Sequence, residues 1–212
     1  MPTERVSSRE AVLDAALRIA DAEGLDALTM RRVATELDIP VTTLYGFVRT
    51  KTEILEALGT VALRDLQPGI DNGEPWTDRL ASQIRDLRAA LAAHPGVVEL
   101  ILTNSAPSSS FDHVREAILQ TLHNGGLDHG DALETMGAVI NYALGFAVAE
   151  GRRARFPDQA AAEPERLRRL HPLEFPRLTQ VADSYLSHQS DAAFEAGLAH
   201  LIAGFTAGLT GS

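Results

Sequence analysis

Residues 28–56, LTMRRVATELDIPVTTLYGFVRTKTEILE, decide the fold because they carry the start and stop signals of two short helices. Thr29 is a favourable N-cap for the first helix. The apolar positions of that helix recur at helical spacing: Val33, Ala34 and Leu37. Asp38 stands where the chain must turn tightly, and Asp tolerates the left-handed conformation better than most residues other than glycine. Pro40 suits the first turn of the second helix. The pattern predicts a helix-turn-helix.

The second short helix is predicted over residues 41–47, which are too few to be stable without packing. Leu44 would point inward. Four residues can lie on the outer side: Val41, Thr42, Thr43 and Tyr45. Residues 50–53, TKTE, fit a capping box and would begin a longer helix that ends near Leu66. A similar box at residues 7–10, with Ser7 as the cap, would begin the helix that precedes the pair.

The composition favours an all-α protein. The chain has 212 residues, 45% of them hydrophobic and 5% aromatic, which is enough apolar content for a core. It has no cysteine, and this excludes a disulfide framework, a thiolate metal site and a cysteine nucleophile. We expect a cytoplasmic protein, because the N-terminus has no apolar signal region and no apolar run reaches the roughly 18 residues that a membrane span needs.

The charge is unevenly distributed along the chain. A net charge of −10 argues against a nucleic-acid-binding surface over the whole molecule. Residues 29–51, however, contain four basic residues and only two acidic ones: Arg31, Arg32, Arg49 and Lys51 against Glu36 and Asp38. A patch of this size suits a local phosphate contact, and it equally suits an ordinary solvated surface.

After residues 69–75, GIDNGEP, further helices are predicted, of which 97–102 is apolar and 131–150 is apolar on most of its circumference: residues 76–93, 97–102, 111–123, 131–150, 178–186 and 191–209. Residues 151–176 are rich in Arg, Pro and Glu, and we expect a partly mobile linker there with one short helical stretch over 165–170. The whole chain would have about nine to ten helices. We expect an N-terminal DNA-binding domain over residues 1–66 and a C-terminal helical domain over residues 67–212.

Two of these helices, residues 131–150 and 191–209, carry small residues at helical spacing. Small residues let helix backbones approach closely, so two such helices per subunit can build a four-helix dimer interface. Packing within one chain would leave the same pattern. The residues expected at such an interface are Gly137, Gly145, Gly197, Leu198, Leu201, Ile202 and Phe205.

Residues 28–58 resemble the DNA-binding domain of the TetR family of bacterial transcriptional repressors. The resemblance rests on the threonine-led helix, the turn, the Leu44-Tyr45 pair and Lys51 at the start of the next helix, and it covers roughly residues 8–66. The remainder is similar, more weakly, to the tetracycline-repressor subgroup, through Trp76 and residues 141–150 and 194–205. The resemblance implies an all-α homodimer that binds a palindromic operator in double-stranded DNA and releases it when a small-molecule effector fills a cavity.

Carried over position by position, the resemblance implies seven DNA-binding residues. Five would lie in the major groove or on its phosphates: Arg31, Val41, Thr42, Thr43 and Tyr45. Thr29 and Lys51 would contact the DNA backbone. Asp38 replaces the usual glycine of the turn, and residues 46–47, Gly-Phe, replace a bulky aromatic residue and a histidine. The operator therefore need not be the tetracycline operator.

The implied effector cavity departs from the tetracycline-repressor pattern. Ile101 stands where a histidine holds the magnesium–drug chelate, Asn141 stands at another histidine position, and Glu150 is retained. We therefore expect no magnesium–tetracycline binding, no metal or other cofactor, and a more apolar effector. The expected lining residues are Gln67, Gln83, Leu87, Leu91, Ile101, Asn104, Ile118 and Asn141. For the apolar ones, ordinary core packing is an equally good explanation.

Other classes of function find less support in the sequence. It shows no Ser–His–Asp arrangement, Gly-rich phosphate loop or GxSxG element, so we do not expect an enzyme. The seven histidines show no metal-ligand spacing on one helix face. The main alternative is a helical small-molecule-binding protein that lacks sequence-specific DNA recognition.

Overall fold

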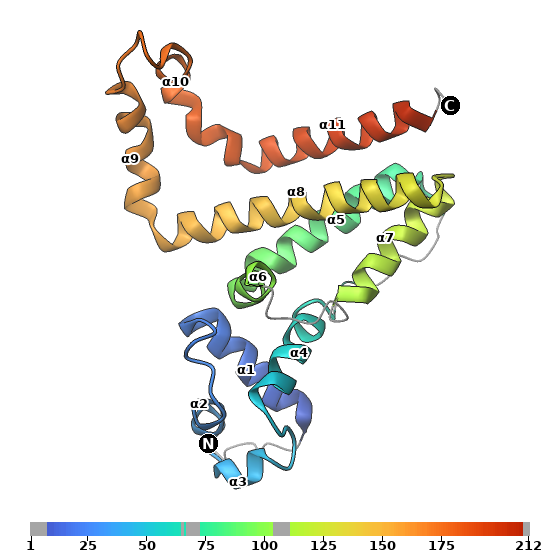
Figure 1. The fold of residues 1–212 in the computed structure, drawn as a ribbon, viewed down its shortest axis with the longest axis vertical. Coiled ribbons are helices and arrows are strands. Elements are labelled where there is room, and N and C mark those ends of the chain that lie inside the picture. Colours follow the sequence, from blue (N-terminus) through green and yellow to red (C-terminus); the bar gives the residue numbers. More distant parts are fainter. Residues whose placement is uncertain (1–7, 65, 67–72, 104–110, 210–212) are drawn as a thin grey trace.

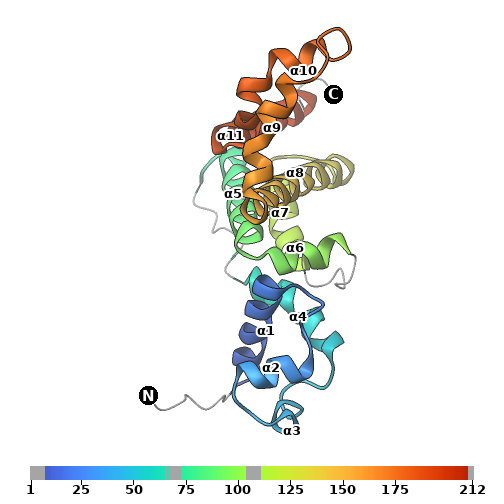
Figure 2. The same cartoon turned by 90° about the vertical axis from the view of Figure 1, so that its left-hand side faces the viewer.

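The structure, a computed structural model, describes residues 8–64, 66, 73–103 and 111–209 (Figures 1 and 2). Those residues form α-helices, one 3-10 helix and connecting turns, with no strand among them. The predicted all-α class is confirmed.

The N-terminal helices form a compact head at one end of the molecule (Figure 1). They are α1 (Arg9–Glu23), α2 (Met30–Glu36), α3 (Val41–Leu44) and α4 (Lys51–Ala62). Their shared core is built from fully buried aliphatic side chains: Val12, Leu28, Val33, Leu44, Ile54 and Leu58. α1 is capped by Ser8, which accepts a hydrogen bond from the Ala11 amide at 3.2 Å, so the prediction of Ser7 as the cap was wrong.

The body is a helical bundle above the head. It comprises α5 (Trp76–Ala93), α6 (Pro95–Leu102), α7 (Asp112–Asn124), α8 (His129–Arg155) and α11 (Asp191–Leu209). α8 is long and apolar enough, by length and composition alone, to cross a membrane. Val139, Ala143 and Ala147 of this helix are buried in one continuous core with residues of α5 and α7, and 28% of its apolar window is buried within the chain.

Most of the segment predicted as a linker is helical, over residues 151–155 and 157–168, and the linker prediction was wrong there. The short helical stretch predicted over 165–170 is confirmed up to Arg168, and residues 169–175 form turns. α8 continues to Arg155, and α9 (Pro157–Arg168) follows after one residue, with Pro157 in its first turn, where the missing amide hydrogen has no helical partner to lose. α10 (Pro176–Gln180) and the 3-10 helix η2 (Ala182–Gln189) replace the single helix expected over 178–186. We call α9, α10 and η2, residues 157–189, the arm. Contacts between separate parts of the arm stabilise it: Leu167 is buried, and Arg168 pairs with Asp183 at 2.6 Å.

Head and body meet where the start of α6 packs on the end of α1 (Figure 2). A Cβ placed on Gly96 would lie 2.7 Å from the Cβ of Ala20, so only glycine fits at this approach. Asp21 of α1 accepts a hydrogen bond from the Gly96 amide at 3.0 Å, and its other oxygen lies 2.8 Å from His94 Nδ1. A carboxylate from the head therefore caps the first turn of a body helix.

The N-terminal half of α11 is fastened to α5 and α8. Arg85 forms a bidentate pair with Glu195, from Nε to Oε1 at 2.8 Å and from Nη2 to Oε2 at 2.7 Å, and Arg88 pairs with both Asp191 and Glu150. The Arg88 guanidinium also lies over the ring of Phe194, 4.3 Å from its centroid. Burial lowers the pKa of Arg88, but the two carboxylates outweigh it, so the pKa is raised and the residue stays charged.

Candidate DNA-binding surface and effector region

Local hydrogen bonds fix the geometry of the helix-turn-helix. Thr29 Oγ1 accepts from the Arg32 amide and Thr50 Oγ1 accepts from the Glu53 amide, each at 3.1 Å, as predicted. Asp38 has φ 51° and is the only non-glycine residue with positive φ in the described part of the chain. This conformation turns the backbone sharply enough for the Ile39 amide to reach the Ala34 carbonyl at 3.0 Å.

α3 is shorter than predicted and presents a polar outer side. It ends at Leu44, which is fully buried, and residues 45–47 form a turn in place of the predicted last helical turn. Thr42, Thr43 and Tyr45 are exposed, Tyr45 to 52%, while Val41 is half-buried. α3 lies at the end of the head farthest from the body (Figure 2).

Two neighbouring arginines of α2 have different environments. Arg32 donates to Glu23 at 2.6 Å and to Glu36 at 2.9 Å, and these bonds raise its pKa further above its usual range. Arg31 is exposed, and its side chain makes no ion pair or hydrogen bond with any described residue. Arg32 is therefore committed to holding the head together, whereas the charge of Arg31 is available to an external partner.

The two residues expected on the DNA backbone already have bonds inside the head. Thr29 uses its hydroxyl to cap α2, and Lys51 donates from Nζ to the Leu25 carbonyl oxygen at 2.9 Å. Lys51 thereby ties the first residue of α4 to the loop between α1 and α2. Both side chains therefore stabilise the head in the absence of DNA. The sequence predicted the cap by Thr29, but it did not predict the bond of Lys51 to Leu25.

The structure brings together only some of the residues expected to line an effector cavity. Leu87, Leu91 and Ile118 are buried in the body, and Ile101 is half-buried. Gln67 and Asn104 lie outside the described residues. Asn141 is exposed on the outer side of α8, away from the core formed by the others, so the structure does not support its placement in a cavity.

Two buried polar atoms of the body stand out because they lack a hydrogen-bond partner among the described residues. Gln83 of α5 donates from Nε2 to the Ala117 carbonyl at 3.2 Å, but its Oε1 is buried without a partner. Thr135 of α8 is 1% exposed, and its Oγ1 also has no partner. Leaving a buried polar group unpaired costs about 1–3 kcal/mol. A ligand that hydrogen-bonds to either atom would remove that cost.

Sequence reasoning missed Thr135, although a signal for it was present. The buried stripe of α8 consists of Ala132, Thr135, Val139, Ala143 and Ala147, at intervals of three and four residues. A hydroxyl in an otherwise apolar helical stripe indicates a polar group directed into the core.

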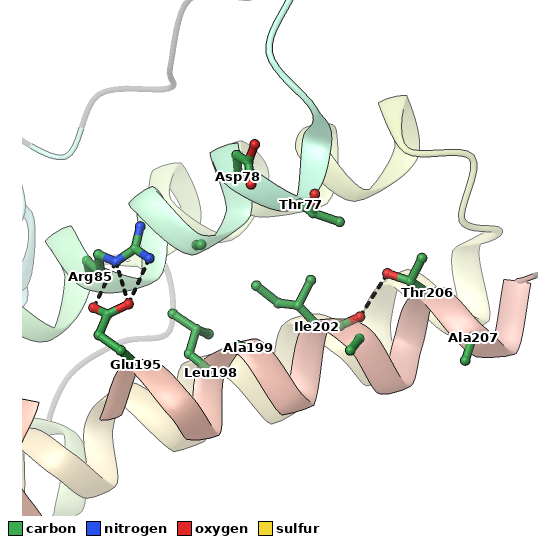
Figure 3. Close-up of a pocket in the computed structure, with 11 residues that line it drawn as sticks. Thr77, Asp78, Arg85, Glu195, Leu198, Ala199, Ile202, Thr206 and Ala207 are labelled. Atoms are coloured by element: carbon green, nitrogen blue, oxygen red, sulfur yellow. Dashed lines mark hydrogen bonds and ion pairs between the residues drawn. The ribbon is translucent and has the colours of Figure 1, made fainter. Parts of the chain in front are cut away.

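A groove of about 570 Å³ lies between α5 and α11 (Figure 3). The Arg85–Glu195 pair lies at one end of it, and Leu198 and Ile202 form part of its apolar wall. None of the expected effector residues that the structure describes lines this groove. Leu198 and Ile202 are buried within their own chain, so they are not on the outer face where a dimer interface was expected.

The other expected interface residues are divided between inner and outer faces. Gly197 packs within the chain, because an added Cβ would lie 2.0 Å from the Tyr142 hydroxyl oxygen. Leu201 and Phe205 are half-buried. Gly137 and Gly145 have open space beside them. From Ala196 to Ala207 the exposed residues of α11 are small and apolar apart from one histidine: Ala196, Ala199, His200, Ala203, Gly204 and Ala207.

Comparison with known families agrees with this architecture. The profile of the bacterial regulatory proteins of the tetR family matches residues 12–58, which cover most of the head. The profile of the tetracyclin repressor-like C-terminal domain matches residues 68–209, which cover the body and arm. The chain belongs to the TetR family. It is thus a transcriptional regulator with an N-terminal helix-turn-helix.

Individual TetR-family relatives match over nearly the whole chain. The class D tetracycline repressor of Escherichia coli is 31% identical over 206 residues, which cover 96% of this chain and 91% of the relative. An HTH-type transcriptional regulator of Saccharopolyspora erythraea is 28% identical over 214 residues, covering 98% and 89%.

Among solved structures, the TetR family protein ActR of Streptomyces coelicolor is similar in its apo form, with a TM-score of 0.78, 28% identity and coverage of 95% of this chain and 96% of ActR. Its complex with actinorhodin gives a TM-score of 0.77 at 27% identity, covering 95% and 98%.

Proposed function

We propose that this TetR-family protein acts in the cytoplasm as a homodimeric repressor, which binds a palindromic operator and releases it when an effector enters the body. The supporting observation is the outer end of the head. Arg31, Thr42, Thr43 and Tyr45 are exposed there on a rigid helix pair, and the Arg31 charge lacks a partner among the described residues. An arginine of this kind can donate two hydrogen bonds to a guanine edge in the major groove.

The outer faces of α8 and α11 support the proposed dimer. Gly137 and Gly145 leave open space on α8, and α11 exposes an uncharged face that includes Ala199 and Ala203. A partner helix can approach such faces closely and build a four-helix interface. Two heads in a symmetric dimer would then engage half-sites about 34–36 Å apart. In this arrangement residues 1–66 contact DNA and residues 67–212 sense the effector and dimerise.

The proposed effector is a largely apolar molecule with hydrogen-bonding groups. It would pack against the aliphatic side chains of Leu87 and Ile118, donate a hydrogen bond to Gln83 Oε1 and bond with the Thr135 hydroxyl. That ActR has been solved with actinorhodin supports a small-molecule effector for this chain as well. Such a ligand changes DNA affinity only through its different affinities for the two states of the protein.

The contact between α6 and α1 provides a route from effector to head. Gly96 and Ala20 are too close to move independently, and the bonds of Asp21 to Gly96 and His94 hold the two helices together. A displacement of α6 would therefore displace α1 and change the separation of the two heads. A spacing that no longer matches the half-sites lowers operator affinity.

Selection of the purified protein against random DNA duplexes, followed by gel-shift titration, tests DNA recognition. We expect one enriched palindrome. Arg31→Ala should lose about 1–3 kcal/mol of discrimination at one base pair of each half-site. Arg18→Ala is the matched control, because it removes the same charge from an exposed arginine of α1 whose nearest carboxylate oxygen lies 3.9 Å away. Failure to enrich any sequence would contradict the proposal, as would equal effects of the two substitutions at every base pair.

A further inference from the structure

The arginines of the molecule fall into two groups. Most of the described arginines lie within ion-pair distance of a carboxylate, as Arg32, Arg85 and Arg88 do. The described arginines that do not are Arg31, Arg49, Arg152, Arg153, Arg155 and Arg177. Arg31 and Arg49 belong to the head. Three of the others cluster at the end of α8, in a chain of net charge −10, and their role needs an explanation.

A cleft of about 330 Å³ opens beside this cluster, between the end of α8, α9 and η2. Arg152 and Arg153 line it, together with the rings of Phe156 and Tyr185. Arg153 is half-buried, and its only side-chain bond to a described residue goes to the neutral Gln189, from Nη1 to Oε1 at 2.6 Å.

The acidic residue of the cleft does not neutralise these arginines. Glu163 also lines the cleft, but it accepts two hydrogen bonds from Arg166, at 2.5 and 2.8 Å. These bonds lower the pKa of Glu163, so it stays ionised and its charge is matched by Arg166. The cleft therefore keeps the positive charge of Arg152 and Arg153.

Arginines at the end of a helix also interact favourably with the helix dipole, which is a sufficient reason for exposed residues such as Arg152 and Arg155. The dipole does not account for Arg153, because a partly desolvated guanidinium that faces a neutral amide lacks a counter-charge. A small anion in the cleft would supply it.

The position and size of the cleft decide which anion fits. α9 lies at the opposite end of the molecule from α3 (Figure 1), so DNA held by the head does not reach the cleft. A volume of about 330 Å³ is in the range of small-molecule sites. We propose that the cleft binds a small aromatic carboxylic acid, with its carboxylate held by Arg152 and Arg153 and its ring packed against Phe156 and Tyr185. Guanidinium groups bind carboxylates through paired, charge-assisted hydrogen bonds, and aromatic rings pack favourably against one another.

This site is distinct from the proposed effector contacts at Gln83 and Thr135, which belong to α5 and to the middle of α8. Isothermal titration calorimetry on the full chain, without DNA, tests it with 2-naphthoate as the probe. The matched ligand is 2-naphthalenemethanol, which keeps the ring and lacks the charge. We expect naphthoate to bind at least about tenfold more tightly than the alcohol, since one charge-assisted hydrogen bond contributes about that factor.

The double substitution Arg152→Gln/Arg153→Gln should weaken naphthoate binding at least about tenfold. Arg177→Gln, which removes an arginine that also lacks a carboxylate partner and lies on α10 outside the cleft, should leave the affinity unchanged. Equal affinity for acid and alcohol overturns the inference, and so does an unchanged affinity in the double variant. If the double variant does not fold, the salt dependence of the wild type decides: naphthoate binding must weaken from 50 to 500 mM salt, roughly as for an ion pair, while alcohol binding must not.

Thr135→Val separates this inference from the proposed function. Naphthoate affinity should be unchanged in that variant. If Thr135→Val abolishes naphthoate binding and the double arginine variant retains it, the acid occupies the body core. That result overturns the arginine cleft and leaves the proposed effector site standing.

Discussion

Thr135→Val gives the sharpest prediction about the body. Valine keeps the branched shape of threonine and removes the hydroxyl, whose oxygen is buried without a partner. An unpaired buried hydroxyl costs about 1–3 kcal/mol, and helix propensities of Val and Thr are similar, so the free energy of unfolding should rise by about that amount. Thr121→Val is the control, because Thr121 is also buried on a helix but donates to the Ala117 carbonyl at 3.1 Å.

Guanidinium chloride unfolding at one fixed protein concentration measures both variants, since the stability of an oligomer depends on concentration. Thr121→Val loses a satisfied hydrogen bond and should be neutral or destabilised by up to about 1.5 kcal/mol. For a chain of this size, a gain of 1 kcal/mol in Thr135→Val should raise Tm by about 2–4 °C. If Thr135→Val is no more stable than the wild type, the hydroxyl is already satisfied in the folded protein and the argument for a ligand contact there fails.

Three further predictions concern other parts of the molecule. Gly197→Ala should destabilise the fold by about 1–3 kcal/mol, because its Cβ would displace the Tyr142 hydroxyl; a double-mutant cycle with Tyr142→Leu should show coupling, and strict additivity would contradict the contact. Gly145→Ala meets no atom within 4 Å in one chain, so it should weaken only dimerisation, and an unchanged dimer constant in sedimentation would remove Gly145 from the interface. The backbone hydrogen bond from Arg49, and then the pairing with Arg9, lower the pKa of Glu53 below its ordinary 4.5. The ionised Glu53 carboxylate therefore stabilises the fold above pH 4.5, and this stabilisation is lost as the pH falls through the lower folded pKa. Glu53→Gln should be less stable than the wild type at pH 7, and the difference in the free energy of unfolding should shrink towards pH 3. A difference that stays constant with pH would argue against this contact.

The features of the head that the sequence predicts well depend on neighbouring residues. The caps at Thr29 and Thr50 use hydrogen bonds that span three residues, and the conformation of Asp38 is a property of one residue in a short turn. Predictions from such local signals hold in the folded protein because few other residues compete for the same hydroxyl and backbone amide groups.

The features that were missed depend on residues far apart in the chain. The composition of residues 157–168 is typical of a linker, and Pro164 lies inside α9. The helix is nevertheless held in place, because Leu167 is buried and Arg168 forms an ion pair with Asp183. Asn141 was expected in a cavity, but the direction of its side chain depends on which face of α8 meets α5. The resemblance assigned Arg31, and not Arg32, to DNA, but the pairing of Arg32 with Glu23 is known only from the structure. Tertiary packing decides each of these cases.

The junction of α6 with α1 has a consequence for protein engineering. Whole heads could be exchanged between TetR-family proteins by joining the chains after α4. Such an exchange would separate Ala20 and Asp21 from His94 and Gly96, which they contact in this chain. A foreign body with any larger residue in place of Gly96 would be pushed off the transplanted α1. Chimaeric regulators built on this chain should therefore carry these four positions as one cassette, even though they lie on both sides of the apparent domain boundary.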